Sequence, residues 1–399
     1  MAEGLSADDW RALLDGVTDH TIGVEEELML LDPDTLDLLP EAARVRAELG
    51  DVVSLRTELP AAQVETASPV CATIAQAAHE LDGARRALAS GVEGWARLAG
   101  AGTHPFADPE GVLIDDPKYA NLVAEFPWVL PRQLVFGLHV HVAVRGDDRA
   151  LAVHNALRSH LPDVAALAGN APLHAGRDTG LASLRPKLSE LLPRQGIPPA
   201  WGSWEERADY ERWGRAGGVF PGAGEPWFEL RAHDEHGTIE LRVPDTQTTP
   251  EEAAGVLAFA AALVVWLAER HDAGETLPVH DHARIAENRW RAMRHGLAGT
   301  LLDLDSGEPQ PARERVRALL DAVAPRPGGW AAPPSSSTPA PSSGATARSA
   351  SARCVRSTDR GASSPGSPTR FCLDGQRRHA YFRRRKVCGT PVNRGGSQP

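Results

Sequence analysis

The chain has 399 residues, 42% of them hydrophobic, and its formal net charge is −11. This apolar content is enough for a sizeable core, and the acidic balance argues against nucleic acid as the main partner. The longest apolar run, residues 253–268, is shorter than the roughly 20 residues that a membrane span needs, so we expect a buried helix and no membrane insertion. The acidic first residues lack a signal-peptide layout, which makes the cytoplasm the expected location.

Charge and composition divide the chain in two. Residues 331–399 hold 12 Lys+Arg but 2 Asp+Glu, and residues 331–368 are rich in Pro, Ser and Ala without apolar periodicity. We therefore expect one catalytic domain over residues 1–325 and a tail over residues 326–399 that is either disordered or the product of a frame-shift. The acidic part contains a single cysteine, Cys71, which fits a reducing compartment and requires no disulfide.

Apolar periodicity predicts strands and helices in a defined order. In chain order we expect a helix at 7–16, a strand at 21–31, short strands near 52–58 and 62–67, a long helix from Thr73 to Leu98, a strand from Leu98 to Thr103, a strand at 135–144, a helix at 147–168, a hairpin of 226–231 with 238–243, and helices at 250–270, 279–297 and 312–323. Strands and helices that follow one another in this way indicate an α+β fold with a mainly antiparallel sheet and flanking helices.

The first long strand carries three consecutive glutamates. Because side chains alternate between the two faces of a strand, Glu25 and Glu27 share one face, while Glu26 lies on the apolar face with Val24 and Leu28. Two carboxylates roughly 7 Å apart repel each other, so a cation or an arginine should lie between or beside them. Glu26 needs a partner of its own, such as an arginine. A solvated edge strand is the alternative interpretation.

A second strand places two histidines together. In residues 135–144, His139 and His141 point to one face and an unbroken apolar set points to the other. Such a pair can bind one metal ion or serve two separate roles, and a structural histidine is the alternative. The same pair would suit a zinc or iron enzyme, such as a hydrolase or an oxygenase, so this class of function stays open.

Two further segments add polar side chains to the same surface. In the predicted hairpin, Glu240 and Arg242 alternate with apolar residues, and the segment from Glu58 to Glu65 is another source of carboxylates. Sites rich in glutamate with one or two imidazoles favour Mg²⁺ or Mn²⁺ over zinc. Magnesium held by carboxylates usually bridges substrate phosphates, which points to nucleotide chemistry.

The common nucleotide-binding loops are missing from the sequence. It has neither a Gly-x4-Gly-Lys-Ser/Thr loop nor a Gly-x-Gly-x-x-Gly motif between a strand and a helix. Neutralisation of phosphate charge would therefore depend on metal ions and arginines. The candidate arginines are Arg242, Arg289 and Arg291 for the nucleotide and Arg177 and Arg185 for the substrate.

Six short motifs follow one another along the chain. They are TIGVEEE at 21–27, GTHPF at 102–106, GLHVHV at 137–142, GRDTG at 176–180, RVPDTQT at 242–248 and ENRWR at 287–291. Together they resemble the type 2 glutamate–cysteine ligases, a family of carboxylate–amine ligases, over about residues 20–323. The resemblance implies a glutamine-synthetase-like fold, in which a curved antiparallel sheet holds metal ions and ATP on its concave face.

The resemblance also implies a reaction and a set of roles. ATP would phosphorylate the γ-carboxylate of glutamate, and the amine of cysteine, or of another acceptor, would then displace phosphate. The implied metal ligands are Glu25, Glu27, Glu58, Glu65, His139 and Glu240. Arg242 would face the transferring phosphate, and His141 or His104 could act as the base. A homodimer is expected by the same likeness, and a defective relative that binds nucleotide without turnover is a further alternative.

Overall fold

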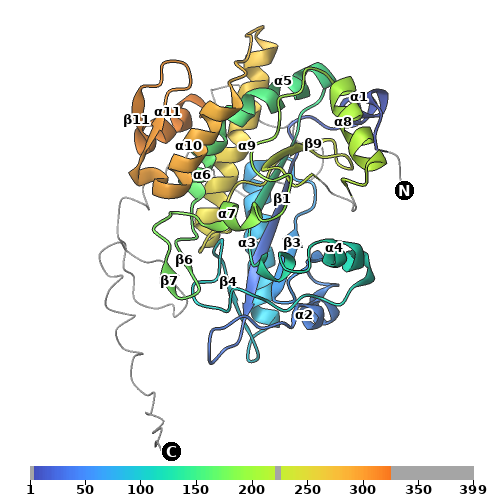
Figure 1. Cartoon of the computed structure of the whole chain (residues 1–399), viewed down its shortest axis with the longest axis vertical. Coiled ribbons are helices and arrows are strands. Elements are labelled where there is room, and N and C mark those ends of the chain that lie inside the picture. The colour runs from blue at the N-terminus through green and yellow to red at the C-terminus, as the bar shows by residue number, and fades with distance from the viewer. Residues whose placement is uncertain (1–3, 221–225, 325–399) are drawn as a thin grey trace, which may run out of the picture.

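The computed structural model describes residues 4–220 and 226–324 (Figure 1), so the predicted tail lies outside the described residues. The helices are α1 (Ala7–Gly16), α2 (Ala42–Leu49), α3 (Ile74–Gly91), α4 (Ala120–Glu125), α5 (Asp147–Leu157), α6 (Leu161–Ala168), α7 (Arg185–Ser189), α8 (Trp204–Ala216), α9 (Pro250–Asp272), α10 (His282–His295) and α11 (Ala312–Ala322). The strands are β1 (Ile22–Leu31), β2 (Leu55–Thr57), β3 (Gln63–Ala67), β4 (Arg97–Ala99), β5 (Leu138–Ala143), β6 (Leu173–His174), β7 (Arg177–Asp178), β8 (Leu230–Ala232), β9 (Thr238–Leu241), β10 (Thr300–Leu302) and β11 (Pro309–Pro311).

The main sheet is antiparallel throughout and confirms the predicted fold class. Its strands lie in the order β2-β3-β1-β5-β9-β8, and β4 pairs with the far end of β1. Strand β1 is the long central strand, and β2 lies at one edge of the order. Two small hairpins, β6 with β7 and β10 with β11, lie apart from this sheet.

One face of the sheet packs against helices and forms the main core. Val24, Val140 and Ile239 come from three neighbouring strands and are all buried in the same hydrophobic cluster. Helices α3, α5 and α9 lie against that face, and Figure 1 shows α3 behind β1. The apolar set of each alternating strand therefore points to the helices, which leaves the polar set on the opposite face.

Helix α9 is the longest helix of the described chain, and most of its residues are apolar. Thr249 caps its first turn through a capping box with Glu252, and Pro250 occupies the first turn, where its missing N–H is harmless. By length and composition it could cross a membrane, but 72% of its most apolar stretch is buried inside the structure. The prediction that residues 253–268 form a buried helix is confirmed.

Some predicted boundaries are wrong. The helix that begins after Thr73 ends at Gly91 instead of Leu98, because Gly94 takes a left-handed backbone conformation with φ of +89°. The predicted helix 147–168 is interrupted by a 3₁₀ turn before α6, whose first turn contains Pro162. Helices α2 and α8 were not predicted, since both are rich in charge and show weak apolar periodicity.

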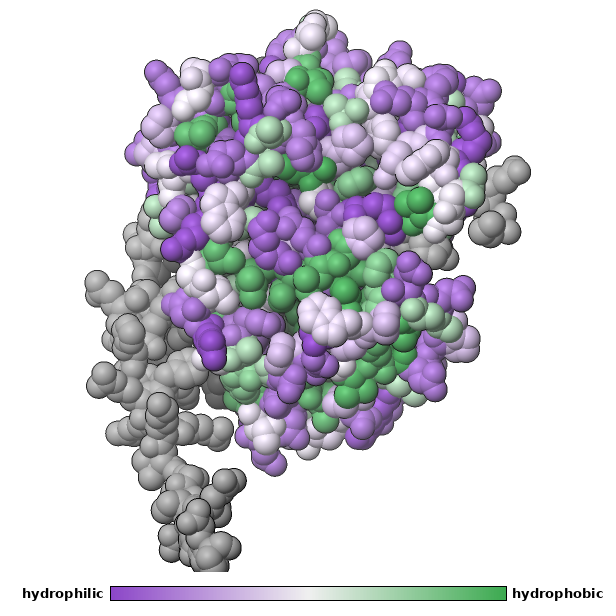
Figure 2. Space-filling model, in the orientation of Figure 1, coloured by the Kyte–Doolittle hydropathy of each residue, from purple (hydrophilic) through white to green (hydrophobic). Residues whose placement is uncertain are grey.

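A satellite hydrophobic cluster lies apart from the main core. Leu59, Leu130 and Leu192 form its buried centre, and partly buried residues such as Tyr119 and Trp227 pack around them. Figure 2 shows hydrophobic residues gathered in a band across the middle of the face that Figure 1 presents, in the region of α7 and α4. This cluster faces the polar side of the sheet and forms one wall of the cavity described next.

Candidate active site

The pairing of the strands brings acidic and basic side chains from distant segments into rows across the polar face. Directly opposed residues on one face of an antiparallel pair have neighbouring side chains. The opposed pairs on this face are Glu27 with Glu65, Glu65 with Arg56, Glu25 with His139, His141 with Glu240, and Glu240 with Arg231. Six strands therefore contribute charged groups to one continuous surface.

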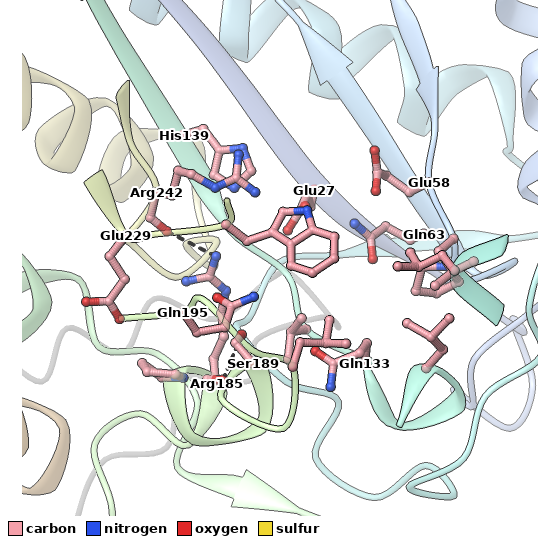
Figure 3. A pocket seen from close by; sticks show the side chains of 18 of the residues that line it. Glu27, Glu58, Gln63, Gln133, His139, Arg185, Ser189, Gln195, Glu229 and Arg242 are labelled. Atoms are coloured by element: carbon pink, nitrogen blue, oxygen red, sulfur yellow. Dashed lines mark hydrogen bonds between the residues drawn. The ribbon is translucent and has the colours of Figure 1, made fainter. Parts of the chain in front are cut away.

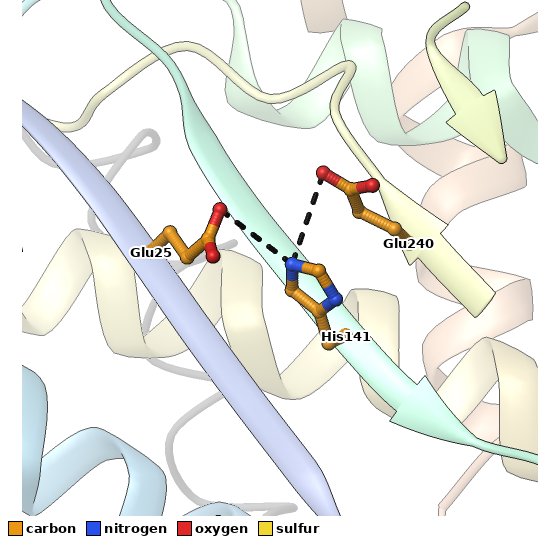
Figure 4. A group of neighbouring side chains, drawn as sticks. All are labelled: Glu25, His141 and Glu240. Atoms are coloured by element: carbon orange, nitrogen blue, oxygen red, sulfur yellow. Dashed lines mark ion pairs between the residues drawn. The ribbon is translucent and has the colours of Figure 1, made fainter. Parts of the chain in front are cut away.

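The first acidic group consists of Glu25, His141 and Glu240 (Figure 4), all buried. The Nε2 atom of His141 lies 3.6 Å from a Glu25 oxygen and 3.7 Å from a Glu240 oxygen. Its Nδ1 atom hydrogen-bonds with Thr238 Oγ1 at 3.0 Å, which fixes the ring. His141 Nε2 is buried without a hydrogen-bond partner, so the geometry suits a metal ion between the imidazole and the two carboxylates.

The second histidine lies beside the same carboxylates. His139 Nδ1 is 3.4 Å from Glu25 Oε2 and 4.0 Å from Glu240 Oε1. Burial and the nearby Arg242 lower the pKa of His139 to about 4, so its imidazole is neutral at physiological pH and able to bind a metal. Two imidazoles and two carboxylates form a donor set that accepts Mn²⁺ as well as Mg²⁺.

The carboxylates of this first group are held in the ionised form. Burial by itself would raise the pKa of Glu25, but the neighbouring imidazoles of His139 and His141 outweigh it and lower the pKa. Burial likewise acts against ionisation of Glu240, but the charges of Arg231 and Arg242 bring its pKa well below the ordinary value. Both carboxylates are therefore negatively charged, which suits the binding of a cation.

The second acidic group consists of Glu27, Glu58 and Glu65, and it contains no imidazole. Burial raises the pKa of Glu27 to about 7, and repulsion from Glu58 adds to the effect. Burial and the neighbouring carboxylates also bring the pKa of Glu65 well above its ordinary value. Three carboxylates that repel one another in a buried place form the oxygen-rich site that Mg²⁺ prefers.

The cavity beside these groups has a volume of about 190 Å³ (Figure 3). Figure 3 shows Glu27, Glu58 and Gln63 on one side and Arg242, Glu229 and Arg185 on the other. Its apolar wall comes from the satellite cluster. The apolar lining residues are Leu59, Pro60, Tyr119, Leu122, Leu130, Val135, Pro186, Leu192 and Trp227.

Three of the predicted arginines line this cavity. Arg242 makes an ion pair with Glu240 at 2.6 Å, and Arg289 makes one with Glu229 at 2.6 Å. Arg185 donates to backbone carbonyl groups, and its closest carboxylate contact, with Asp245, is longer at 3.8 Å. Its Nε atom is buried without a hydrogen-bond partner. Arg185 is therefore the lining arginine best placed to receive an anionic group of a substrate.

The structure does not bring Arg177, Arg291 or His104 to the cavity. Arg177 is exposed on β7, and Arg291 pairs with Glu287 at 2.8 Å along α10. His104 is buried, and its Nε2 atom hydrogen-bonds with the carbonyl of Leu36 at 2.9 Å. None of the three lines the cavity, so their roles at the nucleotide, at the substrate and as a base stay predictions from the sequence.

His141 was predicted as catalytic and His139 as a metal ligand. Only His139 lines the cavity, whereas His141 lies among the carboxylates of the first acidic group. This position fits His141 as a metal ligand, and its role as a base stays a prediction.

Sequence reasoning missed several residues of the site. Glu229, Gln63, Tyr119 and Trp227 line the cavity and carry no motif that would identify them. Arg56 makes an ion pair with Glu25 at 2.6 Å, which is the arginine expected beside the strand carboxylates but not named from the sequence. Arg56 could have been found from its position opposite Glu65, but that position is known only once the register between β2 and β3 is known.

The partner predicted for Glu26 is found on α3. Arg85 donates from Nη2 to Glu26 Oε1 at 2.6 Å, and both side chains are buried behind the sheet. The same nitrogen donates to the carbonyl of Gln247 at 2.7 Å. Glu26 thus has a structural partner, and the division of the three glutamates between the two faces is confirmed.

An antiparallel sheet with helices on one face and two acidic groups on the other is the architecture of glutamine-synthetase-like ligases. Among solved structures, the chain is similar to a glutamate–cysteine ligase of Francisella tularensis in complex with AMP, with a TM-score of 0.53, 11% identity, and coverage of 77% of this chain and 78% of that one. It is also similar to a bifunctional glutathione synthetase of Pasteurella multocida, with a TM-score of 0.53, 11% identity, and coverage of 79% and 47%. Likeness at this identity shows the fold.

The family follows from sequence comparison. The model of glutamate–cysteine ligase family 2 matches residues 21–329. A protein of Rubrobacter xylanophilus with the provisional name glutamate–cysteine ligase 2-3 is 38% identical over 313 residues, which cover 77% of this chain and 84% of the relative. A similarly named protein of Frankia alni is 34% identical over 316 residues, with coverage of 77% and 83%. The chain belongs to the glutamate–cysteine ligase family 2.

Proposed function

We propose that the protein uses ATP to join the γ-carboxylate of glutamate to an amine through a γ-glutamyl phosphate, with cysteine as the acceptor that the family name implies. The observation that carries this proposal is the pair of buried acidic groups beside one cavity, one rich in carboxylates and the other also containing imidazole. The AMP bound in the Francisella tularensis relative supports a nucleotide as one substrate.

Activation is needed because a carboxylate is a poor electrophile at neutral pH. In the proposed reaction, a γ-carboxylate oxygen attacks the terminal phosphorus of ATP, and ADP leaves with the electron pair of the broken bond. The amine nitrogen then attacks the carbonyl carbon, phosphate leaves, and the nitrogen loses a proton. The products of the cysteine reaction are γ-glutamylcysteine, ADP and phosphate.

The side chains divide this work by charge. When bound, Mg²⁺ or Mn²⁺ would supply positive charge to the ATP oxygens, held by Glu27, Glu58 and Glu65 on one side and by Glu25, His139, His141 and Glu240 on the other. Arg242 lies at the boundary between the first acidic group and the cavity, where it can stabilise the transferring phosphate. Arg185 is positioned to orient a substrate carboxylate.

A different amine acceptor is the second candidate. The apolar wall that includes Tyr119, Leu122 and Trp227 offers more hydrophobic surface than the small side chain of cysteine requires. This observation favours an acceptor with an apolar body, joined by the same chemistry.

Phosphate release measured with Mg²⁺, ATP, glutamate and a panel of amines tests the class and the acceptor together. The expected result is release that depends on both glutamate and one amine, with the amide product identified by mass spectrometry. The panel includes cysteine, small polar amines and amines with aromatic or branched side chains. Nucleotide binding without release under any combination would contradict the proposal. Stoichiometric zinc in the purified protein, with no magnesium-dependent turnover, would favour the His-x-His metalloenzyme instead.

A further inference from the structure

Arg56 occupies a special position between the two acidic groups. It lies on β2, at the edge of the sheet, directly opposite Glu65 of β3. Its Nη1 atom is 2.6 Å from Glu25 Oε1, and its Nε atom is 3.8 Å from Glu65 Oε1. Glu25 belongs to the first group and Glu65 to the second. One guanidinium therefore reaches both groups at once.

This contact cannot survive unchanged when a divalent cation binds Glu25. Divalent cations lie about 2.0–2.6 Å from a carboxylate oxygen, so the ion and the guanidinium would lie within about 5 Å of each other and share one carboxylate. At that distance two positive charges repel each other appreciably, even with partial screening. The cation and Arg56 therefore compete for the same negative charge.

Arg56 has room to leave, unlike the other arginines of the first group. Its side chain is 45% exposed, whereas those of Arg231 and Arg242 are 14% and 21% exposed. A second cavity of about 160 Å³ is lined by Arg56 together with residues of α2 and of the β2–β3 edge. Because β2 is an edge strand, no further strand of the sheet order packs beside Arg56.

A phosphate offers the displaced guanidinium a new partner. Guanidinium binds phosphate well through paired hydrogen bonds, and a phosphate held beside the two acidic groups would be within reach of the exposed Arg56 side chain. We propose that Arg56 is a positioning residue that neutralises Glu25 and Glu65 in the metal-free protein and moves to the nucleotide phosphates when metal ions bind. The inference rests on the proposed function, which supplies a nucleotide as the source of the phosphate.

Two binding measurements on an Arg56→Ala variant test this role. With metal alone, calorimetric titration of Mn²⁺ into the metal-free protein should show binding at least about 10-fold tighter than in the wild type, because no internal cation must be displaced. With saturating Mg²⁺, a non-hydrolysable ATP analogue should bind about 10-fold more weakly, because a charged contact with phosphate is lost. Opposite changes of this kind are not expected from structural damage, which would weaken both.

Two further variants control the experiment. Arg44→Ala removes an arginine of similar exposure, 46%, that pairs with Glu48 on α2, and it should change neither affinity. Arg56→Lys keeps a cation at the position and should bind Mn²⁺ as weakly as the wild type. Unchanged or weaker metal binding in Arg56→Ala would overturn the proposal, as would unchanged affinity for the ATP analogue. Failure of the ligase reaction would appear separately as missing glutamate-dependent phosphate release, and the metal titration would still decide the competition.

Discussion

At the scale of single residues, neighbouring carboxylates of the sheet have different charge states for identifiable reasons. Glu25 faces two imidazoles and Arg56, so its ionised form is stabilised. Glu27 is buried and is repelled by Glu58, so its pKa is raised and its protonated form is favoured. A metal ion would find the first group already ionised and would have to compete with protons at the second.

Loss of one ligand charge in the first group should stop the reaction. Glu25→Gln or Glu240→Gln is expected to lower glutamate-dependent phosphate release by at least about 100-fold. Mutation of a residue that only hydrogen-bonds to a metal ligand already lowers metal affinity or activity about 10–100-fold. Circular dichroism and thermal unfolding should show that the fold persists. Wild-type rates in either folded variant would refute the assignment of these residues as ligands.

The raised pKa of Glu27 predicts a pH dependence of stability in the metal-free protein. The folded protein holds this proton up to about pH 7, whereas the ordinary pKa is 4.5, so the folded state is favoured at low pH and loses stability as pH rises through 7. The loss should be on the order of 3 kcal/mol between about pH 4.5 and about pH 8. Urea unfolding in the presence of a chelator measures it, and Glu27→Gln should flatten the curve. Equal slopes in the variant and the wild type would contradict the prediction.

Gly137 controls the position of Arg185. A Cβ atom at Gly137 would lie 2.1 Å from Arg185 Nη2, so Gly137→Ala should push the guanidinium away from the cavity. Because the end of a long side chain can move, we expect the fold to survive and KM for glutamate to rise about 10-fold, as for the loss of one charged contact. Gly23→Ala is the matched control, because its Cβ would meet His141 Cβ at 3.4 Å, close to an ordinary contact. Equal KM values in the two variants would argue against a role of Arg185 in binding glutamate.

At the scale of elements, β1 joins two environments. One face carries carboxylates of the two acidic groups. The other face is linked to α3 by the buried ion pair of Glu26 and Arg85. Arg85 also reaches the carbonyl groups of Gln247 and Thr248, just before α9 begins. A strand, two helices and a loop therefore depend on one guanidinium.

Removal of Arg85 should destabilise the whole domain. Arg85→Ala leaves the Glu26 carboxylate buried without a partner, which typically costs about 3–5 kcal/mol of unfolding free energy. Arg86→Ala removes an exposed neighbour that pairs with Asp82, and it should cost less than about 0.5 kcal/mol. Chemical denaturation of both variants gives the comparison. Similar losses in the two would show that the buried pair has no special role.

At the scale of the whole molecule, every residue assigned to the site lies between β1 and α10. The described strands of the sheet, the satellite cluster and the cavity likewise lie within residues 4–220 and 226–324. We propose on this basis that residues 1–325 form the catalytic domain. The expected homodimer stays a prediction that size-exclusion chromatography with light scattering can test.

A shortened chain tests the domain boundary. A protein that ends at residue 324, just beyond α11, should keep its secondary structure, its unfolding midpoint to within about 4 °C, and its affinity for Mn²⁺. The full chain is the control. Loss of metal binding in a shortened protein that still folds would show that residues after 324 contribute to the site.

Much of this site could be predicted from the sequence because side chains on strands repeat every two residues. Alternation placed Glu25 with Glu27 and Glu26 behind the sheet, and it put Glu240 beside Arg242. What alternation cannot provide is the register between strands, which sets Arg56 opposite Glu65 and His141 opposite Glu240. The apolar wall of the cavity could not be predicted from the sequence either, because its residues come from loops and short helices without periodicity.

The run of three glutamates has a consequence for how β1 is assembled. If β1 shifted by one residue against β5 during folding, a glutamate would still reach the polar face, so acidity alone would not reject the misaligned strand. Arg85 distinguishes the two alignments. It pairs with one carboxylate behind the sheet, whereas a shifted strand would bury Glu25 and Glu27 there together. The buried ion pair would thus favour the correct alignment of β1.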